Sequence, residues 1–189
     1  MQRKIYLYQL NLNKEIIRLF KELDNSFKFE KVTNDLVVFT DTDCYTDEPI
    51  DYDSIRELII QDFAEDLTLY IEPFSKKSSI TNNDFYEFFK DIDNGIYYIE
   101  DLIISIIIKG NEILKKFIIS EIVKDLDSDT IDSVLGFIKA DMNSSKAAKA
   151  MYLHRNTLNY RLDKFIEKTN INIRTFKGAN AVYMLLKYK

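Results

Sequence analysis

Apolar residues in the first hundred positions follow two different spacings. Alternating or continuous apolar runs rich in Tyr, Val, Ile and Phe predict strands, whereas apolar residues three and four positions apart predict amphipathic helices. Strands are expected at 5–10, 27–32, 36–40, 67–71 and 95–99, and helices at 14–23, 55–63 and 84–89. The segment Thr33-Asn34-Asp35 joins two strands and is typical of a hairpin turn. This order predicts a ferredoxin-like α+β fold, an antiparallel sheet with its helices on one face.

From residue 101 onward the spacing is helical. Residues 101–123 carry a dense, Ile-rich apolar band that is wider than one packing contact needs. This segment is either a helix that packs between two domains or a dimer interface, and one helix can serve both roles. Shorter helices are expected at 130–140, 145–151 and 179–186, and a longer one through Leu158 to Lys168. We therefore expect an α+β domain at 1–100, a connecting helix at 101–126 and an all-α domain at 127–189.

The stretch from Asn143 to Lys168 has the arrangement of a helix-turn-helix. Asn143 and Ser144 are good N-cap residues for the first, short helix. The second helix has one apolar stripe, and its first two turns present polar and mostly cationic side chains on the opposite side. A helix-turn-helix needs this division, since the start of the second helix meets base edges in the major groove while its back packs on the protein. The stripe consists of Leu158, Leu162, Phe165 and Ile166.

Side chains on and around that polar face are our candidates for contacts to double-stranded DNA. Asn pairs well with adenine, and Arg with guanine or with phosphate. A charged helix face is also an ordinary surface feature in most proteins, so spacing alone leaves that alternative open. The candidates are Ser144, Lys146, His154, Arg155, Asn156, Thr157, Asn159, Tyr160, Arg161 and Lys164.

Further apolar residues are expected to complete the core of the all-α domain. Val134 and Leu135 should pack on the alanines and leucines of the helix-turn-helix. Gly178 should permit a turn before the last helix. Tyr183 is assigned to the core, although it could equally lie at an interface. The other residues expected to close the domain are Ile171, Ile173, Phe176, Leu185 and Leu186.

Charge is distributed unevenly along the chain. The whole protein carries a net charge of −5, which would ordinarily argue against nucleic acid. Residues 1–129, however, hold 15 Lys and Arg against 27 Asp and Glu, a net −12, whereas residues 130–189 hold 11 against 4, a net +7. A cationic module on an acidic body is typical of a protein that presents one face to DNA.

The sequence from Ala147 to Arg174 resembles the C-terminal helix-turn-helix of the PucR/CdaR family of bacterial transcriptional regulators, and is also similar to the DNA-binding end of Fis-type proteins. It departs from the family pattern at Asn170, where Gly is usual, and at Asn172, where Asp is frequent. Asn tolerates the left-handed backbone that a helix C-terminus requires, so the first departure matters little. The matching residues are Ala147, Ala148, His154, Arg155, Asn156, Thr157, Leu158, Tyr160, Arg161, Leu162, Thr169 and Arg174.

The region before it resembles the degenerate GGDEF-like domain of the same regulators. The segment from Gly95 to Leu102 looks like the place where a short strand leads through an acidic residue and Asp-Leu into a helix. Active cyclases of that superfamily carry a Gly-Gly-acidic motif on the central hairpin, but the hairpin here reads Val32-Thr33-Asn34-Asp35. Without a glycine turn the backbone cannot approach a nucleotide closely. We therefore expect no cyclase activity.

Other catalytic or metal-binding chemistry has little support. The acidic loop at 41–53 lacks EF-hand spacing, so a solvated loop is expected rather than a metal site. Its carboxylates are Asp41, Asp43, Asp47, Glu48, Asp51 and Asp53. Cys44 is interpreted as an incidental thiol, and the single histidine, His154, as a helix cap or a residue near the turn. We expect no enzyme activity, no metal and no cofactor.

No membrane association is expected either. The chain has no run of 18 apolar residues, and its N-terminus lacks a signal-peptide core. These features favour a cytoplasmic protein.

Three functional hypotheses follow. The first is a dimeric, sequence-specific DNA-binding regulator of the PucR/CdaR type, whose N-terminal domain serves dimerisation or senses an unknown small-molecule effector. The second is a protein-interaction adaptor that keeps the helix-turn-helix fold without binding DNA. A remnant nucleotide-binding sensor is the third and weakest. Family members usually carry a further sensory region ahead of the GGDEF-like segment, and this chain has almost none. Its effector is therefore expected to be absent, different or sensed by a partner.

Overall fold

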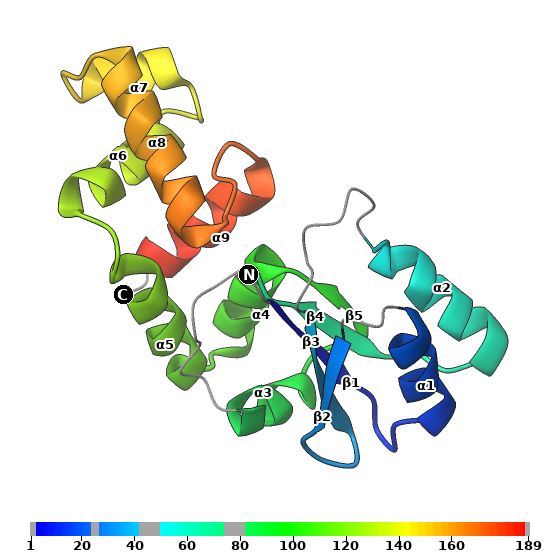
Figure 1. The fold of residues 1–189 in the computed structure, drawn as a ribbon. Helices are drawn as coiled ribbons and strands as arrows, with labels where there is room; N and C mark the ends of the chain where they lie inside the picture. Colours follow the sequence, from blue (N-terminus) through cyan, green and yellow to red (C-terminus); the bar gives the residue numbers. More distant parts are fainter. Residues whose placement is uncertain (1–2, 24–26, 42–49, 74–81, 188–189) are drawn as a thin grey trace. The chain divides into compact units, whose positions relative to one another are not determined.

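The structure is a computed structural model that describes residues 3–23, 27–41, 50–73 and 82–187. The chain divides into two compact units, Met1–Ile99 and Glu100–Lys189. Figure 1 labels their helices and strands. Cys44 and three of the carboxylates discussed above, those of Asp43, Asp47 and Glu48, lie outside the described residues.

The described part of the N-terminal unit forms a five-stranded sheet with strand order β2-β3-β1-β4-β5. Its elements are β1 (Arg3–Tyr8), α1 (Lys14–Leu23), β2 (Phe27–Lys31), β3 (Leu36–Asp41), α2 (Tyr52–Phe63), β4 (Thr68–Ile71), α3 (Asn82–Phe89) and β5 (Gly95–Tyr97). The first four strands pair antiparallel in the ferredoxin-like order, which confirms the predicted α+β class. β5 instead pairs parallel with β4, so the sheet is mixed and not wholly antiparallel. The reason is that α3 forms the crossover connection that a parallel pair requires.

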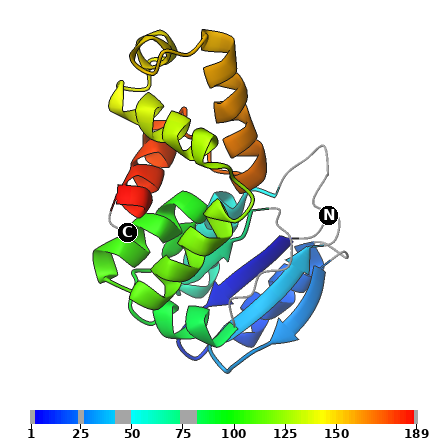
Figure 2. The same ribbon diagram turned by 90° about the vertical axis from the view of Figure 1, so that its left-hand side faces the viewer.

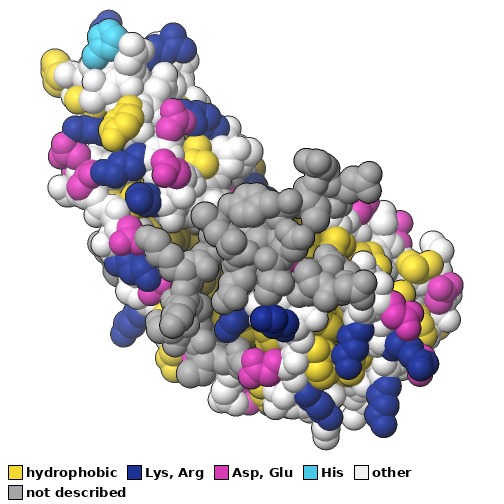
Figure 3. Space-filling view, in the orientation of Figure 1, with side chains coloured by type: hydrophobic (Ala, Val, Ile, Leu, Met, Phe, Trp, Pro, Cys, Tyr) yellow, Lys and Arg dark blue, Asp and Glu magenta, His cyan; other side chains and the backbone are white. Residues whose placement is uncertain are grey.

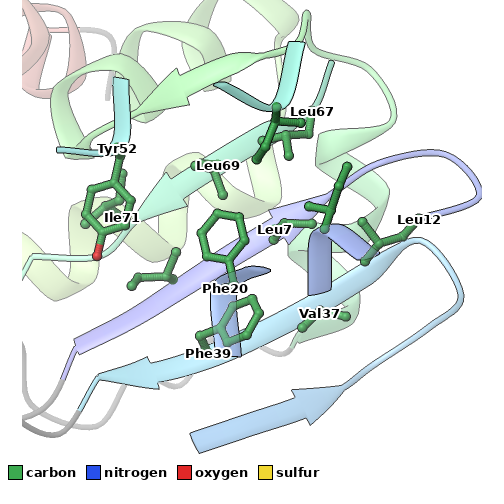
Figure 4. Packing of buried hydrophobic residues seen from close by; sticks show 12 residues of the cluster. Leu7, Leu12, Phe20, Val37, Phe39, Tyr52, Leu67, Leu69 and Ile71 are labelled. Atoms are coloured by element: carbon green, nitrogen blue, oxygen red, sulfur yellow. The ribbon is translucent and has the colours of Figure 1, made fainter. Parts of the chain in front are cut away.

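Helices cover both faces of this sheet, so the prediction that they lie on one face was wrong. On one face α1 and α2 bury aliphatic residues of β1, β3 and β4, with Phe20 stacked on Phe39 at 5.2 Å between ring centroids (Figure 4). On the other face α3 places Phe85 4.5 Å from the ring of Tyr6, and Phe89 lies near Tyr8. The cause is the sequence of β1, where large aliphatic residues alternate with tyrosines and both sets must be buried.

α2 begins earlier than its apolar pattern indicated. Asp51 is its N-cap, because a carboxylate oxygen accepts a hydrogen bond from the backbone N–H of Ser54 at 3.2 Å. Asp51 and Asp53 therefore belong to a helix start and not to the predicted solvated loop. Asp41 is buried at the end of β3 and pairs with Arg3 at 2.8 Å. The described residues contain no cluster of three or more His, Cys, Asp or Glu that could hold a metal ion.

Glu72, just after β4, is a buried carboxyl group whose ionisation should affect stability. The Tyr6 hydroxyl donates to its Oε1 at 3.3 Å, and only 8% of the residue is exposed. Burial raises the pKa of Glu72 from 4.5 to about 7, although the charge of Lys4 and the hydrogen bond from Tyr6 oppose the shift. Between these two pH values, the folded protein keeps a proton on Glu72 that the unfolded chain has already released.

The free energy of unfolding is accordingly expected to fall as the pH rises from about 4.5 to about 7, and to fall by on the order of 3 kcal/mol in total. Glu72→Gln keeps a neutral side chain at every pH, so it should remove most of this dependence. Urea unfolding at pH 5 and pH 8 measures it. Glu57→Gln, at an exposed position of α2, is the control and should retain the wild-type dependence. A Glu72→Gln variant with the wild-type slope would contradict the assignment.

The C-terminal unit is helical over its described length (Figure 2). Its helices are α4 (Ile99–Lys109), α5 (Glu112–Val123), α6 (Ser128–Lys139), α7 (Ser144–Ala150), α8 (Arg155–Thr169) and α9 (Phe176–Lys187). The connecting segment forms two helices and not the single one predicted. Gly110 has a φ of +68°, which ends α4, and Asn111 caps the start of α5 by accepting from the N–H of Leu114. No helix among the described residues is long and apolar enough to span a membrane.

Most of the predicted core of this unit is confirmed. Val134, Leu158, Leu162, Ile171, Ile173, Leu185 and Leu186 are buried, whereas Leu135 and Tyr183 are only partly buried. Phe176 was wrongly placed in the core, because it stands in the first turn of α9 with 77% of its surface exposed.

Gly178 has a different role from the predicted turn. It lies inside α9, and a Cβ atom there would lie 2.2 Å from the carbonyl oxygen of Asn172. The turn before α9 is instead held by Thr175, whose hydroxyl oxygen accepts from the N–H of Gly178 at 3.1 Å. Glycine is therefore needed at 178 for close backbone approach.

Candidate nucleic-acid interface

α6, α7 and α8 pack on one another, and α8 is the longest of the three. Leu158, Leu162 and Phe165 form its inner stripe, and none of them is exposed. Ile166, the fourth residue of the predicted stripe, is partly buried. The sequence pattern thus assigned the inner side of α8 correctly, and the polar residues of its first two turns lie on the outer side.

α7 begins as its sequence indicates. Asn143 is the N-cap, since its side-chain oxygen accepts from the backbone N–H of Lys146 at 3.0 Å. Ala147 and Ala148 are buried, and such small side chains allow α7 to lie close to α8. Ser144 is the first residue of the helix and is partly buried, while Lys146 is exposed.

The turn between α7 and α8 is a Schellman turn. The N–H of Leu153 donates to the carbonyl oxygen of Ala148 at 2.9 Å, and the N–H of Tyr152 to that of Lys149 at 3.3 Å. Tyr152 takes the left-handed conformation, with a φ of +54°. His154 then caps α8, since its Nδ1 accepts from the N–H of Asn156 at 3.2 Å. This confirms the helix cap as the role of the single histidine.

The first two turns of α8 form an exposed polar surface. Arg155, Asn156 and Thr157 are exposed, Tyr160 is 68% exposed, and Asn159 is partly buried. Figure 3 shows the histidine side chain with Lys or Arg side chains beside it at the α7 end of this unit. These residues present amide, hydroxyl and guanidinium groups to the solvent, and such groups can form hydrogen bonds with base edges.

Arg161 and Lys164 are held differently. Arg161 donates to the hydroxyl of Ser133 at 3.2 Å and forms an ion pair with Asp129, and Lys164 forms an ion pair with Asp127. The hydrogen bond from Lys164 is the main reason that the pKa of Asp127 lies well below its usual range, and the same pair raises the pKa of Lys164. These two predicted contact residues therefore join α8 to the start of α6.

The remaining cations near the turn differ in their partners. Lys146 pairs with Asp141 at 2.6 Å, in an ion pair that is exposed on both sides. Across the part of the chain that the structure describes, neither Arg155 nor Lys149 has a carboxylate partner. Lys149 was not among the predicted contact residues, although its spacing of three from Lys146 places both on one side of α7. Arg155 and Lys149 are thus the cations most available to an anionic ligand.

The sequence of this unit matches that of a known protein family. The match covers residues 130–188, and the family is the PucR C-terminal helix-turn-helix domain. The C-terminal unit of this protein carries a PucR C-terminal helix-turn-helix domain. Asn170 fits this assignment, because it ends α8 with a φ of +57° where the family usually has glycine.

Two proteins of Bacillus subtilis (strain 168) are similar in sequence to about a third of this chain. The uncharacterized protein YxkF is 38% identical over 66 residues, which are 35% of this chain and 22% of that protein. The DNA-binding transcriptional activator AdeR is 30% identical over 66 residues, which are 35% of this chain and 16% of AdeR. This chain therefore matches less than a quarter of the length of either relative.

A solved structure has the same overall fold. It is the crystal structure of a regulator of polyketide synthase expression from Bifidobacterium adolescentis. The TM-score is 0.52 at 14% sequence identity, and the match covers 98% of this chain and 78% of that one. The solved structure therefore shares the arrangement of an α+β unit followed by a helical unit.

Proposed function

We propose that this protein is a sequence-specific DNA-binding transcriptional regulator of the PucR/CdaR type. The observation that carries the proposal is the division of α8, whose apolar side is buried while Arg155, Asn156 and Thr157 are exposed at its start. The PucR-type domain supports it, and so does the relative AdeR, which is named as a DNA-binding transcriptional activator. Double-stranded bacterial DNA is the partner, which places the action of the protein in the cytoplasm.

The exposed side chains suit the major groove of duplex DNA. The start of the second helix of a helix-turn-helix enters this groove. Asn156 and Asn159 can each make the paired hydrogen bonds that distinguish adenine, and Arg155 can contact guanine or a phosphate. Lys146 and Lys149 on α7 would then reach phosphates beside the groove, together with the turn residue His154.

The ion pairs limit how many cations are available to DNA. Arg161 and Lys164 already have carboxylate partners in the first turn and at the N-cap of α6, so we assign them to positioning α8. The phosphate contacts then fall to Arg155 and Lys149, and to Lys146, whose ion pair with Asp141 is exposed on both sides and can be exchanged for a phosphate. In a plot of the logarithm of affinity against the logarithm of salt concentration, each phosphate contact contributes about −0.9 to the slope.

We expect Arg155→Ala to reduce the salt slope by about one unit per protomer, because it removes one phosphate contact. Asn156→Ala should cost about 1–3 kcal/mol on the preferred sequence and little on unrelated DNA, because it removes a base contact. Fluorescence anisotropy over a salt series measures both, with a duplex selected from a random library by the wild-type protein. Lys168→Ala is the control, since it changes an exposed lysine in the last turn of α8.

Wild-type binding that is negligible and independent of salt would reject the proposal and favour the adaptor hypothesis. A Lys168→Ala variant that lost as much affinity as Arg155→Ala would show that general charge, and not the start of α8, determines binding.

The N-terminal unit is proposed to be a non-enzymatic, GGDEF-like domain that serves dimerisation or regulation. Its hairpin turn is closed by a side chain, since the Thr33 hydroxyl oxygen accepts from the N–H groups of Asp35 and Leu36 at 3.1 and 2.9 Å. This turn offers no glycine backbone to a nucleotide. Because helix-turn-helix proteins commonly bind two half-sites about one DNA turn apart, we propose that the protein acts as a homodimer. Light scattering on the free protein and on its DNA complex would test this.

A further inference from the structure

Tyr152 has a backbone conformation that its residue type does not favour. It occupies the position after the C-cap of α7, where most Schellman turns have glycine, and its φ is +54°. A β-carbon in this conformation is crowded against the carbonyl oxygen that follows it. Glycine would form the same two backbone hydrogen bonds without that crowding. The turn itself therefore gives no reason for a tyrosine.

Packing gives no reason for it either. The residue is 98% exposed, so folding buries almost none of its ring and the ring contributes almost no packing energy. Asn170 has a similar φ, but asparagine tolerates that conformation well. Met142, also left-handed, is partly buried and gains from packing. Tyr152 combines an unfavourable backbone with a fully exposed aromatic ring, a combination that suggests a functional contact.

The position of Tyr152 identifies the kind of contact. It lies two residues before the His154 cap, on the turn that leads into the exposed start of α8, and three residues after Lys149. When the start of a recognition helix lies in the major groove, the turn before it lies beside the sugar-phosphate backbone that borders the groove. A tyrosine hydroxyl is one of the groups that proteins use to bind phosphate oxygens.

We propose that Tyr152 is a DNA-backbone contact, with its hydroxyl donating to a phosphate oxygen while its ring covers the adjoining sugar. The inference rests on the proposed DNA-binding function and adds a residue to it. Such a contact fixes the register of α8 in the groove and carries no base preference, so it should act equally on all duplexes.

Two substitutions test this contact. Tyr152→Phe keeps the ring and removes the hydroxyl, and should weaken binding about threefold to tenfold, the range for one lost hydrogen bond. Tyr152→Gly removes the whole side chain and should weaken binding by about tenfold or more, while it raises the midpoint of thermal unfolding by about 3 °C. Affinity is measured with the duplex selected by the wild-type protein and with an unrelated duplex of equal length. Both duplexes should show the same fold loss.

Phe176→Ala is the matched control, since it removes another exposed aromatic ring of this unit and should leave DNA affinity unchanged. Wild-type affinity in both Tyr152 variants, together with impaired binding by Arg155→Ala, would overturn the Tyr152 contact and leave the proposed function intact. A loss of both thermal stability and affinity in Tyr152→Gly would assign the tyrosine a structural role and equally overturn it. If the wild-type protein bound neither duplex, the proposed function itself would fail.

Discussion

Gly178→Ala is expected to destabilise the C-terminal unit by about 3 kcal/mol or more, at the upper end of the cost of overpacking a core. The added methyl group would lie 2.2 Å from the Asn172 carbonyl oxygen and 2.7 Å from its carbon. Both atoms belong to the backbone and cannot rotate away as a side chain can. The segment between α8 and α9 must therefore move, which would disturb the buried Ile171 and Ile173.

Urea unfolding followed by far-UV circular dichroism measures this loss. Gly95→Ala is the matched control, because a Cβ there meets only the ring of Tyr97 at an ordinary distance of 3.5 Å. It should cost no more than about 1 kcal/mol. Equal stability of the two variants would show that the contact between Gly178 and Asn172 is not close in solution.

Phe39→Ala is expected to destabilise the N-terminal unit by about 3–5 kcal/mol, the usual cost of truncating a buried phenylalanine. The ring is fully buried in β3, and three other phenylalanine rings surround it at centroid distances of 5.2 to 5.9 Å. These rings come from α1 and β2, so none of them can fill the cavity without moving its own element. The variant should therefore lose contacts between three neighbouring elements at once.

Thermal unfolding and urea unfolding are both suitable measurements. The control for Phe39→Ala is again Phe176→Ala, which makes the same chemical change at a position that is 77% exposed. We expect a change within about 0.5 kcal/mol for this control. A similar loss in both variants would contradict the assignment of Phe39 to the centre of the core.

Features that depend on neighbouring residues were predictable from the sequence. The caps at Asn143 and His154 and the left-handed Asn170 each involve residues within about one helical turn, so local chemistry determines them. The inner stripe of α8 follows from helical periodicity in the same way. The N-cap and the buried side of the candidate recognition helix were therefore predicted correctly, although α8 begins at Arg155, three residues before the predicted range.

Features that depend on contacts between distant segments were not predictable. The partners of Arg161 and Lys164 lie 32 and 37 positions away, so sequence spacing gave no reason to separate these cations from Arg155. Gly178 is restricted by the carbonyl of Asn172 across a turn whose path the sequence does not specify. The second covered face of the sheet was missed because the tyrosines of β1 were not recognised as an apolar surface that needs its own helix.

In α8, the residues that stabilise the fold are different from the residues that are exposed at its start. This division affects which substitutions the protein can accept. Leu158, Leu162 and Phe165 hold the helix in the fold, helped by Arg161 and Lys164 from its sides. The exposed positions 155, 156 and 160 contribute little to stability and can be exchanged almost freely. A library randomised at these positions should therefore contain mostly folded proteins. Under the proposed DNA-binding function, new target sequences can arise by substitution there without compensating changes elsewhere, which makes this helix a practical starting point for the redesign of DNA specificity.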